Sequence, residues 1–375
     1  PDAVPPTPAS TTAAASASSA TASPSASGST AAASPSPSDP TAGLERYYSQ
    51  TVDWKNCGQA DCATIKAPLN YADPEGPSIN LSITRVPATG DRIGSLFVNP
   101  GGPGGSAVDY AKAADYIVSD VIRKRFDIVG VDPRGVAHSE PVNCMSDGQI
   151  DGFMAADGTP DSPAEEQETV EESEVPAQTC ERNGGALVKY MSTVDSARDL
   201  DIARAAVGDD ALNYLGKSYG TMLGATYAEL LPTTVGRMVL DGVLPAGLDL
   251  VEVTKGQADA FEVAVRDFVA YCLGSSGCPL DGSVDEGLEQ LRAWLTSLDA
   301  NPLKGGDRDL NEALATYATL SYLYFPGSDY PRLKDALRAG INEANPLPLL
   351  GLLDARISRG PDGHYYYNSS DAFYA

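Results

Sequence analysis

The 375-residue sequence has 26 Lys and Arg residues against 51 Asp and Glu residues, which gives a formal net charge of −25. This charge argues against a protein that binds nucleic acid or an anionic membrane surface, because both need a basic face. Apolar residues make up 42% of the chain and charged residues 21%, a composition typical of a globular protein over most of the length.

Residues 1–43 differ from the rest of the chain. All of them except Asp2, Val4 and Asp39 are Ala, Ser, Thr, Pro or Gly. Such a segment cannot bury enough apolar surface to offset the entropy of ordering it. We therefore expect a disordered tether over 1–43. The residues that follow suffice for one large α/β domain with an insertion, or for two domains.

Strands and helices are expected to alternate from residue 79 to residue 241. Ile79–Val86 alternates apolar and polar residues with the period of a half-buried strand, and an acidic surface excursion is expected at 146–178. Further strands are expected at 95–99, 126–131, 213–216 and 237–241, and helices at 106–118, 193–207 and 219–231. Short apolar strands between helices predict an α/β fold with a mostly parallel sheet covered on both faces.

From residue 250 onward only helical periodicity is visible. Helices are expected at 251–273, 284–299, 308–325, 331–340 and 347–357. We therefore predict an α/β core over 44–244 and a helical lid or cap over 245–375, with no later strand in the lid.

The pentapeptide from Gly216 to Gly220 has the pattern G-x-S-x-G between an expected strand and an expected helix. In this setting the serine lies on a strained strand-to-helix turn that presents its hydroxyl above the sheet, and only glycine on either side leaves room for the turn. We expect Ser218 to be the nucleophile, with Gly216 and Gly220 forming its elbow. The backbone N–H of Tyr219, at the helix N-terminus, would then stabilise an oxyanion. A structural serine in a tight turn is the alternative.

A glycine-rich segment at 99–105 follows the strand at 95–99. Its backbone N–H groups can approach a ligand closely and supply a second oxyanion donor, for which Gly102 is the first candidate and Gly101 the second. A phosphate-binding loop is not expected, because the sequence has no G-K-[ST] and no G-x-G-x-x-G with a fitting acidic partner. We expect no cofactor. A purely structural turn remains the alternative.

Four motifs in this order resemble the secreted tripeptidyl aminopeptidases, which are α/β-hydrolase serine peptidases related to proline iminopeptidases. They are N-P-G-G-P-G-G-S at 99–106, F-D-I-V-G-V-D-P-R-G at 126–135, G-K-S-Y-G-T at 216–221 and R-M-V-L-D-G-V at 237–243. The resemblance covers most of residues 50–375, and Asn368–Tyr374 resembles the family's return from lid to sheet. Asn99 stands where iminopeptidases usually carry His, which fits the tripeptidyl branch better.

The resemblance implies an α/β-hydrolase fold and an acyl-enzyme on Ser218. It also implies removal of short peptides or single residues from the free N-terminus of a peptide substrate, with a lid that restricts the substrate and in that family often binds its ammonium group through carboxylates. An acidic protein suits that role. Two other functions stay open: an esterase on the same fold, because a fold does not determine which acyl group is cleaved, and a non-catalytic exported binding protein that keeps the elbow as scaffold.

The rest of the catalytic triad is harder to place. In this fold the order is Ser, then Asp or Glu, then His, with the last two on late strands beyond the lid. Asp241 is a minor candidate for the acid and His364 for the base, while His138 has the wrong chain order. We therefore expect the catalytic Asp and His to lie in residues absent from this chain, with the late strands missing. The chain alone would then be nearly inactive.

The turn Asp132-Pro-Arg134-Gly follows a buried strand. Such a turn is more often a structural ion pair that holds loops than a substrate contact. We expect the structural role here.

Six cysteines are spaced as three pairs: Cys57 and Cys62, Cys144 and Cys180, and Cys272 and Cys278. The spacing of a metal site is absent, so we expect no bound metal. Three disulfides in this order, formed in an oxidising compartment, are the better explanation, although fifteen pairings are possible and six free thiols are the alternative. No apolar run reaches the roughly 18 residues that span a membrane. We expect a monomeric bacterial protein that is secreted or attached to the cell envelope.

Overall fold

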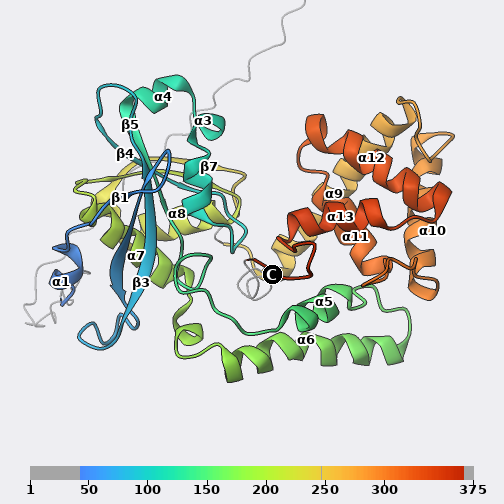
Figure 1. Cartoon of the computed structure of the whole chain (residues 1–375), viewed down its shortest axis with the longest axis horizontal. Coiled ribbons are helices and arrows are strands. Elements are labelled where there is room, and N and C mark those ends of the chain that lie inside the picture. The colour runs from blue at the N-terminus through green and yellow to red at the C-terminus, as the bar shows by residue number, and fades with distance from the viewer. Residues whose placement is uncertain (1–42, 246, 367–375) are drawn as a thin grey trace, which may run out of the picture. The chain divides into compact units, whose positions relative to one another are not determined.

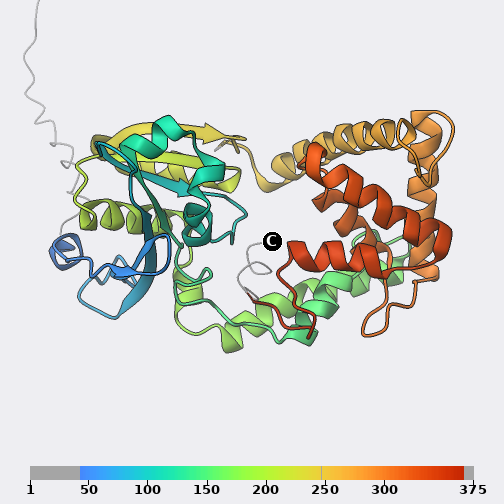
Figure 2. The same cartoon turned by 45° about the horizontal axis from the view of Figure 1, so that its top comes forward.

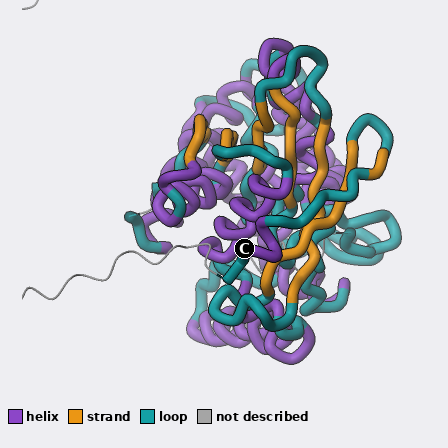
Figure 3. The backbone as a smooth tube through the Cα atoms, turned by 90° about the vertical axis from the view of Figure 1, so that its left-hand side faces the viewer, coloured by secondary structure: helices purple, strands orange, loops and turns teal. Residues whose placement is uncertain are grey.

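The computed structural model describes residues 43–245 and 247–366. The predicted tether and the stretch at 368–374 therefore lie outside the described residues, apart from Gly43. The described residues contain a seven-stranded sheet with the strand order β1-β2-β3-β5-β4-β6-β7, whose strands lie side by side in Figure 3. The strands are β1 (Lys55–Asn56), β2 (Asp61–Pro68), β3 (Ser78–Val86), β4 (Gly94–Asn99), β5 (Phe126–Val131), β6 (Leu212–Lys217) and β7 (Val235–Asp241).

The sheet has an antiparallel edge and a parallel centre. Strands β5, β4, β6 and β7 pair in parallel, whereas β3 pairs antiparallel with both β2 and β5, and β1 pairs antiparallel with β2. The predicted parallel sheet is thus confirmed for β4–β7, and the three N-terminal strands make it mixed. Because β4, β5 and β6 are parallel, the loops that follow them meet at one edge of the sheet.

Helices cover both faces of the sheet (Figure 1). Consecutive residues of β4 belong to opposite apolar clusters, Phe97 on the side of α7 and α8 and Val98 on the side of α2, as the period of two in a strand requires. The helices before residue 245 are α1 (Glu45–Tyr48), α2 (Ala107–Lys112), α3 (Ala114–Ile117), α4 (Asp120–Arg125), α5 (Asp147–Ala155), α6 (Pro163–Asn183), α7 (Thr193–Ala206) and α8 (Tyr219–Leu230), of which α5 and α6 lie away from the sheet.

The remaining helices pack on one another around a second apolar core (Figure 2). They are α9 (Leu250–Leu273), α10 (Val284–Ala300), α11 (Glu312–Ser321), α12 (Pro326–Glu343) and α13 (Leu347–Arg356), close to the predicted segments. The structure contains the three disulfides in the expected pairing, Cys57–Cys62, Cys144–Cys180 and Cys272–Cys278. None of the helices in the described ranges is long and apolar enough to cross a membrane.

Three local predictions need correction. The surface excursion at 146–178 contains α5 and most of α6, and both helices begin with a capping box, Ser146 with Gln149 and Ser162 with Glu165. This S-x-x-[EQ] signal was readable in the sequence. The helix expected at 106–118 is interrupted at Ala113, and β2 is a strand where none was expected.

A buried carboxylate joins three elements beneath the sheet. Asp201 on α7 accepts hydrogen bonds from Tyr48 at 2.7 Å, from Arg204 Nε at 2.6 Å and from Tyr227 at 2.6 Å. Burial raises the pKa of Asp201, but the hydrogen bonds from Arg204, Tyr227 and Tyr48 outweigh it, so the pKa lies below its usual value. The ionised carboxylate therefore stabilises the fold.

Replacing Asp201 with asparagine should lower the free energy of unfolding at neutral pH by about 3 kcal/mol, because Arg204 loses its buried carboxylate. A carboxyl whose pKa is lowered by folding stabilises the protein above its unfolded pKa of about 4, and this stabilisation is lost as the pH falls through the folded pKa. The difference in free energy of unfolding between the native protein and the variant, measured by urea unfolding, should be smaller at pH 3 than at pH 7. A difference of equal size at both pH values would contradict the assignment.

Candidate active site

Ser218 occupies the turn between β6 and α8 and has an unusual backbone conformation. Its φ is +53° and its ψ is −124°. Left-handed φ is uncommon for a residue with a side chain and is often found at functional sites. The Ser218 N–H donates to the Asp241 carbonyl at 3.0 Å, and the Ser218 carbonyl accepts from the Thr221 N–H at 2.8 Å and from its hydroxyl at 2.6 Å. These contacts hold the turn, and the serine itself is exposed.

Gly216 and Gly220, the two glycines around Ser218, have no room for a side chain. A Cβ on Gly216 would lie 2.3 Å from the Gly220 carbonyl oxygen, and a Cβ on Gly220 would lie 2.8 Å from the Asn99 carbonyl oxygen. Both separations are shorter than atoms tolerate. A Cβ on Gly224, one turn later, would lie 2.7 Å from the ring of Tyr214. The crowding expected at a nucleophile elbow is therefore present on both sides of the serine.

The glycine-rich loop after β4 packs directly against this turn. A Cβ on Gly101 would lie 2.4 Å from the Lys217 carbonyl oxygen, 2.9 Å from Ser218 Cβ and 3.0 Å from the Tyr219 nitrogen. The Gly101 N–H donates to Asn99 Oδ1 at 2.9 Å. Because the Asn99 side chain already accepts this N–H, Gly102 is the better of the two candidate donors. Sequence reasoning did not assign Asn99 this role.

Replacing Gly101 with alanine should destabilise the protein by more than backbone strain alone, because Gly101 has a φ of +91° and no room for a Cβ. Gly185 is a matched control: its φ is +70°, but nothing lies within 4 Å of its added Cβ. We expect Gly185→Ala to cost on the order of 1 kcal/mol and Gly101→Ala clearly more, measured by urea unfolding. Equal costs for the two variants would contradict the close packing of this loop.

Asp132, after β5, fixes the helix that follows the glycine-rich loop. Its Oδ1 accepts from the Ser106 hydroxyl at 2.8 Å and from the Val108 N–H at 2.9 Å, and its Oδ2 accepts from the His138 N–H at 3.1 Å. Burial raises the pKa of Asp132, and these hydrogen bonds oppose that effect. Asp132 therefore links the start of α2 to the loop after β5.

The structural ion pair expected at the turn from Asp132 to Arg134 is present, but the partner of Arg134 is not Asp132. Arg134 instead forms two hydrogen bonds with Asp199 on α7, at 2.7 and 2.6 Å. Both side chains are buried, with 0% and 2% exposure. Both residues have the expected structural role, but in separate hydrogen-bond networks. Asp132 holds the start of α2, and Arg134 holds α7.

The structure places the triad candidates as follows. The Asp241 carboxylate lies 3.5 Å from Lys217 Nζ and is largely exposed. The Nε2 of His138 lies 3.4 Å from Asp109 Oδ2, and the Nδ1 of His364 lies 3.0 Å from Asp147 Oδ2. Each candidate thus has a partner of its own. The elbow, the glycine-rich loop and the first turn of α8 come together.

No group of three or more His, Cys, Asp or Glu side chains within 43–245 and 247–366 is placed to hold a metal ion. At the turn between β6 and α8, the serine lies beside backbone N–H groups, an arrangement suited to acyl transfer.

This fold and this turn define a class of protein. The α/β-hydrolase fold family matches residues 94–350, and the chain belongs to that family. It is 35% identical over 346 residues to the serine protease Hip1 of Mycobacterium tuberculosis, covering 86% of this chain and 65% of that protein. It is 36% identical over 320 residues to carboxylesterase B of the same species, and the match covers 84% of this chain and 61% of that protein.

A third relative is the tripeptidyl aminopeptidase of Streptomyces coelicolor, 36% identical over 250 residues and covering 60% of this chain and 46% of that protein. The chain thus spans 65% or less of the length of these relatives. Among solved structures, the proline iminopeptidase of Mycobacterium smegmatis matches with 15% identity and a TM-score of 0.33, covering 81% of this chain and 73% of that one. That similarity is too low to carry an argument about function.

Proposed function

We propose that the protein is a serine hydrolase that removes short peptides, tripeptides in particular, from the free N-terminus of peptide substrates. The observation that carries this proposal is the strained backbone of Ser218 at the start of α8, in contact with Gly101. The similarity to a serine protease and to a tripeptidyl aminopeptidase supports the choice of a peptide as substrate.

In this mechanism the Ser218 hydroxyl attacks the scissile carbonyl carbon, and a base takes the hydroxyl proton. The N–H groups of Tyr219 and Gly102 donate to the oxyanion of the tetrahedral intermediate. The base gives that proton to the leaving nitrogen, the C–N bond breaks, and the shortened peptide leaves as an amine, while the N-terminal tripeptide remains as an ester on Ser218. Water, activated by the same base, hydrolyses this ester and restores the serine.

We further propose that the base and its carboxylate partner lie outside the described residues. One observation supports this. Val239 on the edge strand β7 and Val243 just after it are 59% and 58% exposed, which suits burial by further strands. Residues 1–375 alone would then turn over substrate no faster than their Ser218→Ala variant.

Residues 245–375 would form the lid over the site in the full-length protein, and carboxylates on it would bind the substrate's ammonium group. The three disulfides support a location outside the cytoplasm, either secreted or at the cell envelope. An esterase is the second candidate, favoured by the 36% identity to carboxylesterase B.

The substrate class can be tested on the full-length protein with three probes: a tripeptide anilide with a free N-terminus, the same anilide acetylated at its N-terminus, and a short-chain nitrophenyl ester. We expect the free anilide to be cleaved with the highest kcat/KM and acetylation to lower it by at least about tenfold, since one charged contact is lost. Ester hydrolysis without anilide cleavage would favour the esterase.

A further inference from the structure

Both backbone polar groups of Ser218 are tied to the segment that follows β7. The Ser218 N–H donates to the Asp241 carbonyl at 3.0 Å. The Ser218 carbonyl is connected to the same segment through Thr221, whose hydroxyl donates to that carbonyl at 2.6 Å and accepts from the Leu244 N–H at 2.9 Å. Gly242 has a φ of +71°, and a Cβ added there would lie 3.8 Å from the Ser218 nitrogen, so the segment turns directly beside the serine.

The Thr221 hydroxyl has a defined direction. A hydroxyl group carries one proton, and its oxygen here accepts from the Leu244 N–H, so its own proton points to the Ser218 carbonyl. Thr221 is 1% exposed, so water does not compete for either bond. The same carbonyl also accepts from the Thr221 backbone N–H at 2.8 Å. The hydroxyl is therefore a second donor to a carbonyl that the helix already satisfies, and it fixes and polarises that group.

The carbonyl that Thr221 binds belongs to the same peptide group as the candidate oxyanion donor. The Ser218 carbonyl and the Tyr219 N–H lie in one plane, because the C–N bond between them has partial double-bond character. A hydrogen bond accepted by the carbonyl therefore fixes the direction of the N–H and also makes it a stronger donor, since successive hydrogen bonds polarise one another. Tyr219 is the first residue of α8, so its N–H has no partner within the helix. Its nitrogen faces the glycine-rich loop, where a Cβ added to Gly101 would lie 3.0 Å from it.

We propose that Thr221 is a positioning residue of the oxyanion site. A chain of hydrogen bonds starts at the Leu244 N–H and passes through the Thr221 hydroxyl to the Ser218 carbonyl. It ends at the Tyr219 N–H, which donates to the oxyanion. Because that N–H meets its full partner charge only when the oxyanion forms, Thr221 affects kcat rather than KM. This role rests on the proposed acyl transfer at Ser218, but not on whether the acyl group comes from a peptide or from an ester.

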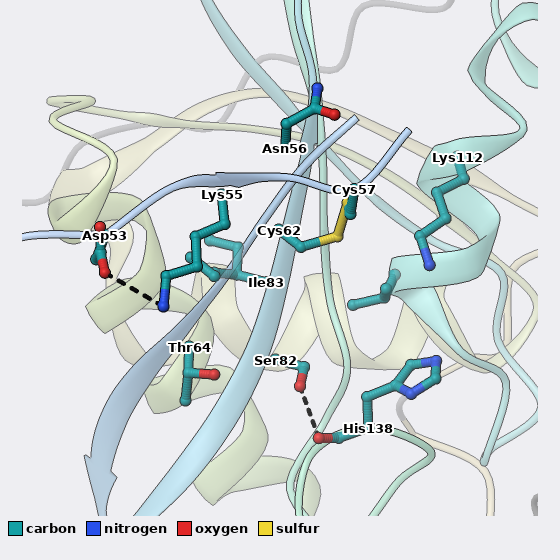
Figure 4. A pocket seen from close by; sticks show the side chains of 12 residues that line it. Asp53, Lys55, Asn56, Cys57, Cys62, Thr64, Ser82, Ile83, Lys112 and His138 are labelled. Carbon is teal, nitrogen blue, oxygen red and sulfur yellow. Dashed lines mark hydrogen bonds and ion pairs between the residues drawn. A yellow bond between two sulfur atoms is a disulfide. The ribbon is translucent and has the colours of Figure 1, made fainter. Parts of the chain in front are cut away.

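The second candidate donor, Gly102, has a separate support. Its loop runs into α2, and Asp132 binds the first turn of that helix. Asp132 also accepts from the His138 N–H, and the His138 carbonyl accepts from the Ser82 hydroxyl on β3 at 2.6 Å, in the wall of the cavity drawn in Figure 4. These bonds anchor the loop of Gly102 to β3 through residues other than Thr221. Removing the Thr221 hydroxyl should therefore weaken one oxyanion donor and leave the other in place.

The test measures kcat and KM separately for Thr221→Val and Thr221→Ser in the full-length protein. Rates on a tripeptide anilide and on a nitrophenyl ester are divided by the concentration of sites that a fluorophosphonate titrates to completion, so that unfolded protein is not counted. Valine keeps the shape of threonine but removes the hydroxyl. We expect kcat to fall roughly tenfold, less than the roughly 10²-fold or more lost when an oxyanion donor is deleted, because the Tyr219 N–H remains. KM should stay within about twofold of native, and Thr221→Ser should recover kcat to within about threefold.

Thr319→Val is the matched control. Thr319 is also a buried helical threonine, 2% exposed, and its hydroxyl donates to a backbone carbonyl, that of Ala315, at 2.8 Å, but it lies on α11 in the second apolar core. Each valine variant loses one such bond, so the urea concentration at the midpoint of unfolding should fall by a similar amount in both. Only Thr221→Val should lose kcat. A kcat per titrated site within about twofold of native, or a loss that Thr221→Ser does not recover, would overturn the proposal.

A second measurement needs no turnover. In the full-length protein, serine labelled with ¹³C at its carbonyl and tyrosine labelled with ¹⁵N select Ser-Tyr peptide groups, among them Ser218–Tyr219 and Ser321–Tyr322. The first signal is identified by its loss in Ser218→Ala, and the second by its loss in Ser321→Ala. A hydrogen bond accepted by the carbonyl draws electron density from the peptide nitrogen, so Thr221→Val should move the first ¹⁵N resonance upfield and leave the second unchanged. A first resonance that does not move would overturn the proposal.

The outcomes separate the role of Thr221 from the proposed function. Ester hydrolysis without anilide cleavage would refute the peptide substrate, and the kcat of Thr221→Val on the ester would still decide the role of Thr221. A resonance that moves without a loss of kcat would overturn that role and leave the proposed function standing. A protein that cleaves neither substrate would refute both.

Discussion

Replacing Ser218 with alanine should lower the kcat of the full-length protein on a tripeptide anilide by roughly 10⁴-fold or more, the scale of loss when a serine nucleophile is removed. Without the hydroxyl no acyl-enzyme forms, and only the oxyanion donors and substrate binding remain. Labelling by a fluorophosphonate probe should disappear in the same variant. Kinetics and labelling therefore measure the same atom by independent means.

Ser358→Ala is a close control, because Ser358 is also a serine with left-handed backbone, at a φ of +56°. Both substitutions keep a Cβ, so neither changes the strain at its position, and circular dichroism and Tm should match the native protein in each. Only Ser218→Ala should lose activity and labelling. Anilide hydrolysis that survives in this variant would remove Ser218 from the mechanism, and with it the proposed reaction.

The elbow was predictable from sequence because its physics is local. Gly216, Ser218 and Gly220 lie within five residues, and the crowding that requires Gly216 arises at the turn itself, against the Gly220 carbonyl oxygen, although Gly220 is crowded by the distant Asn99. The parallel strands β4 and β5 were predictable for a similar reason, since strands buried on both faces are short apolar runs. The strand β2 was not predicted, because Ile65 is the only large aliphatic residue in it, so the alternation around exposed Thr64 and Lys66 gives a weak apolar signal.

Contacts between distant segments could not be predicted. The bond from Asn99 to the Gly101 N–H is local, but its importance depends on Gly101 packing against Ser218, more than a hundred residues away. The partner of Arg134 is 65 residues along the chain, and no spacing pattern distinguishes Asp199 from the neighbouring acids of α7.

Replacing Arg134 with methionine should lower the free energy of unfolding by about 3–5 kcal/mol, the usual cost of leaving one member of a buried ion pair without its partner. Within the described part of the chain, the Asp199 carboxylate would keep one side-chain donor, the Tyr71 hydroxyl, which donates to Oδ1 at 2.7 Å. The carbonyl oxygens of Pro68, Leu69 and Tyr190 would also lose a donor, since Arg134 donates to each of them at 3.1 Å. Urea unfolding measures this loss directly.

A double-mutant cycle separates the ion pair from these carbonyl bonds. Asp199→Leu should be destabilising by itself. Combined with Arg134→Met it removes both charges, so the double variant should lose less free energy of unfolding than the two single variants together, by at least about 2 kcal/mol. The exposed pair Lys304–Asp309, at 81% and 38% exposure, should give a coupling below about 1 kcal/mol in the same experiment. Additive losses at Arg134 and Asp199 would mean that the carbonyl bonds, rather than the carboxylate, account for the cost of removing the arginine.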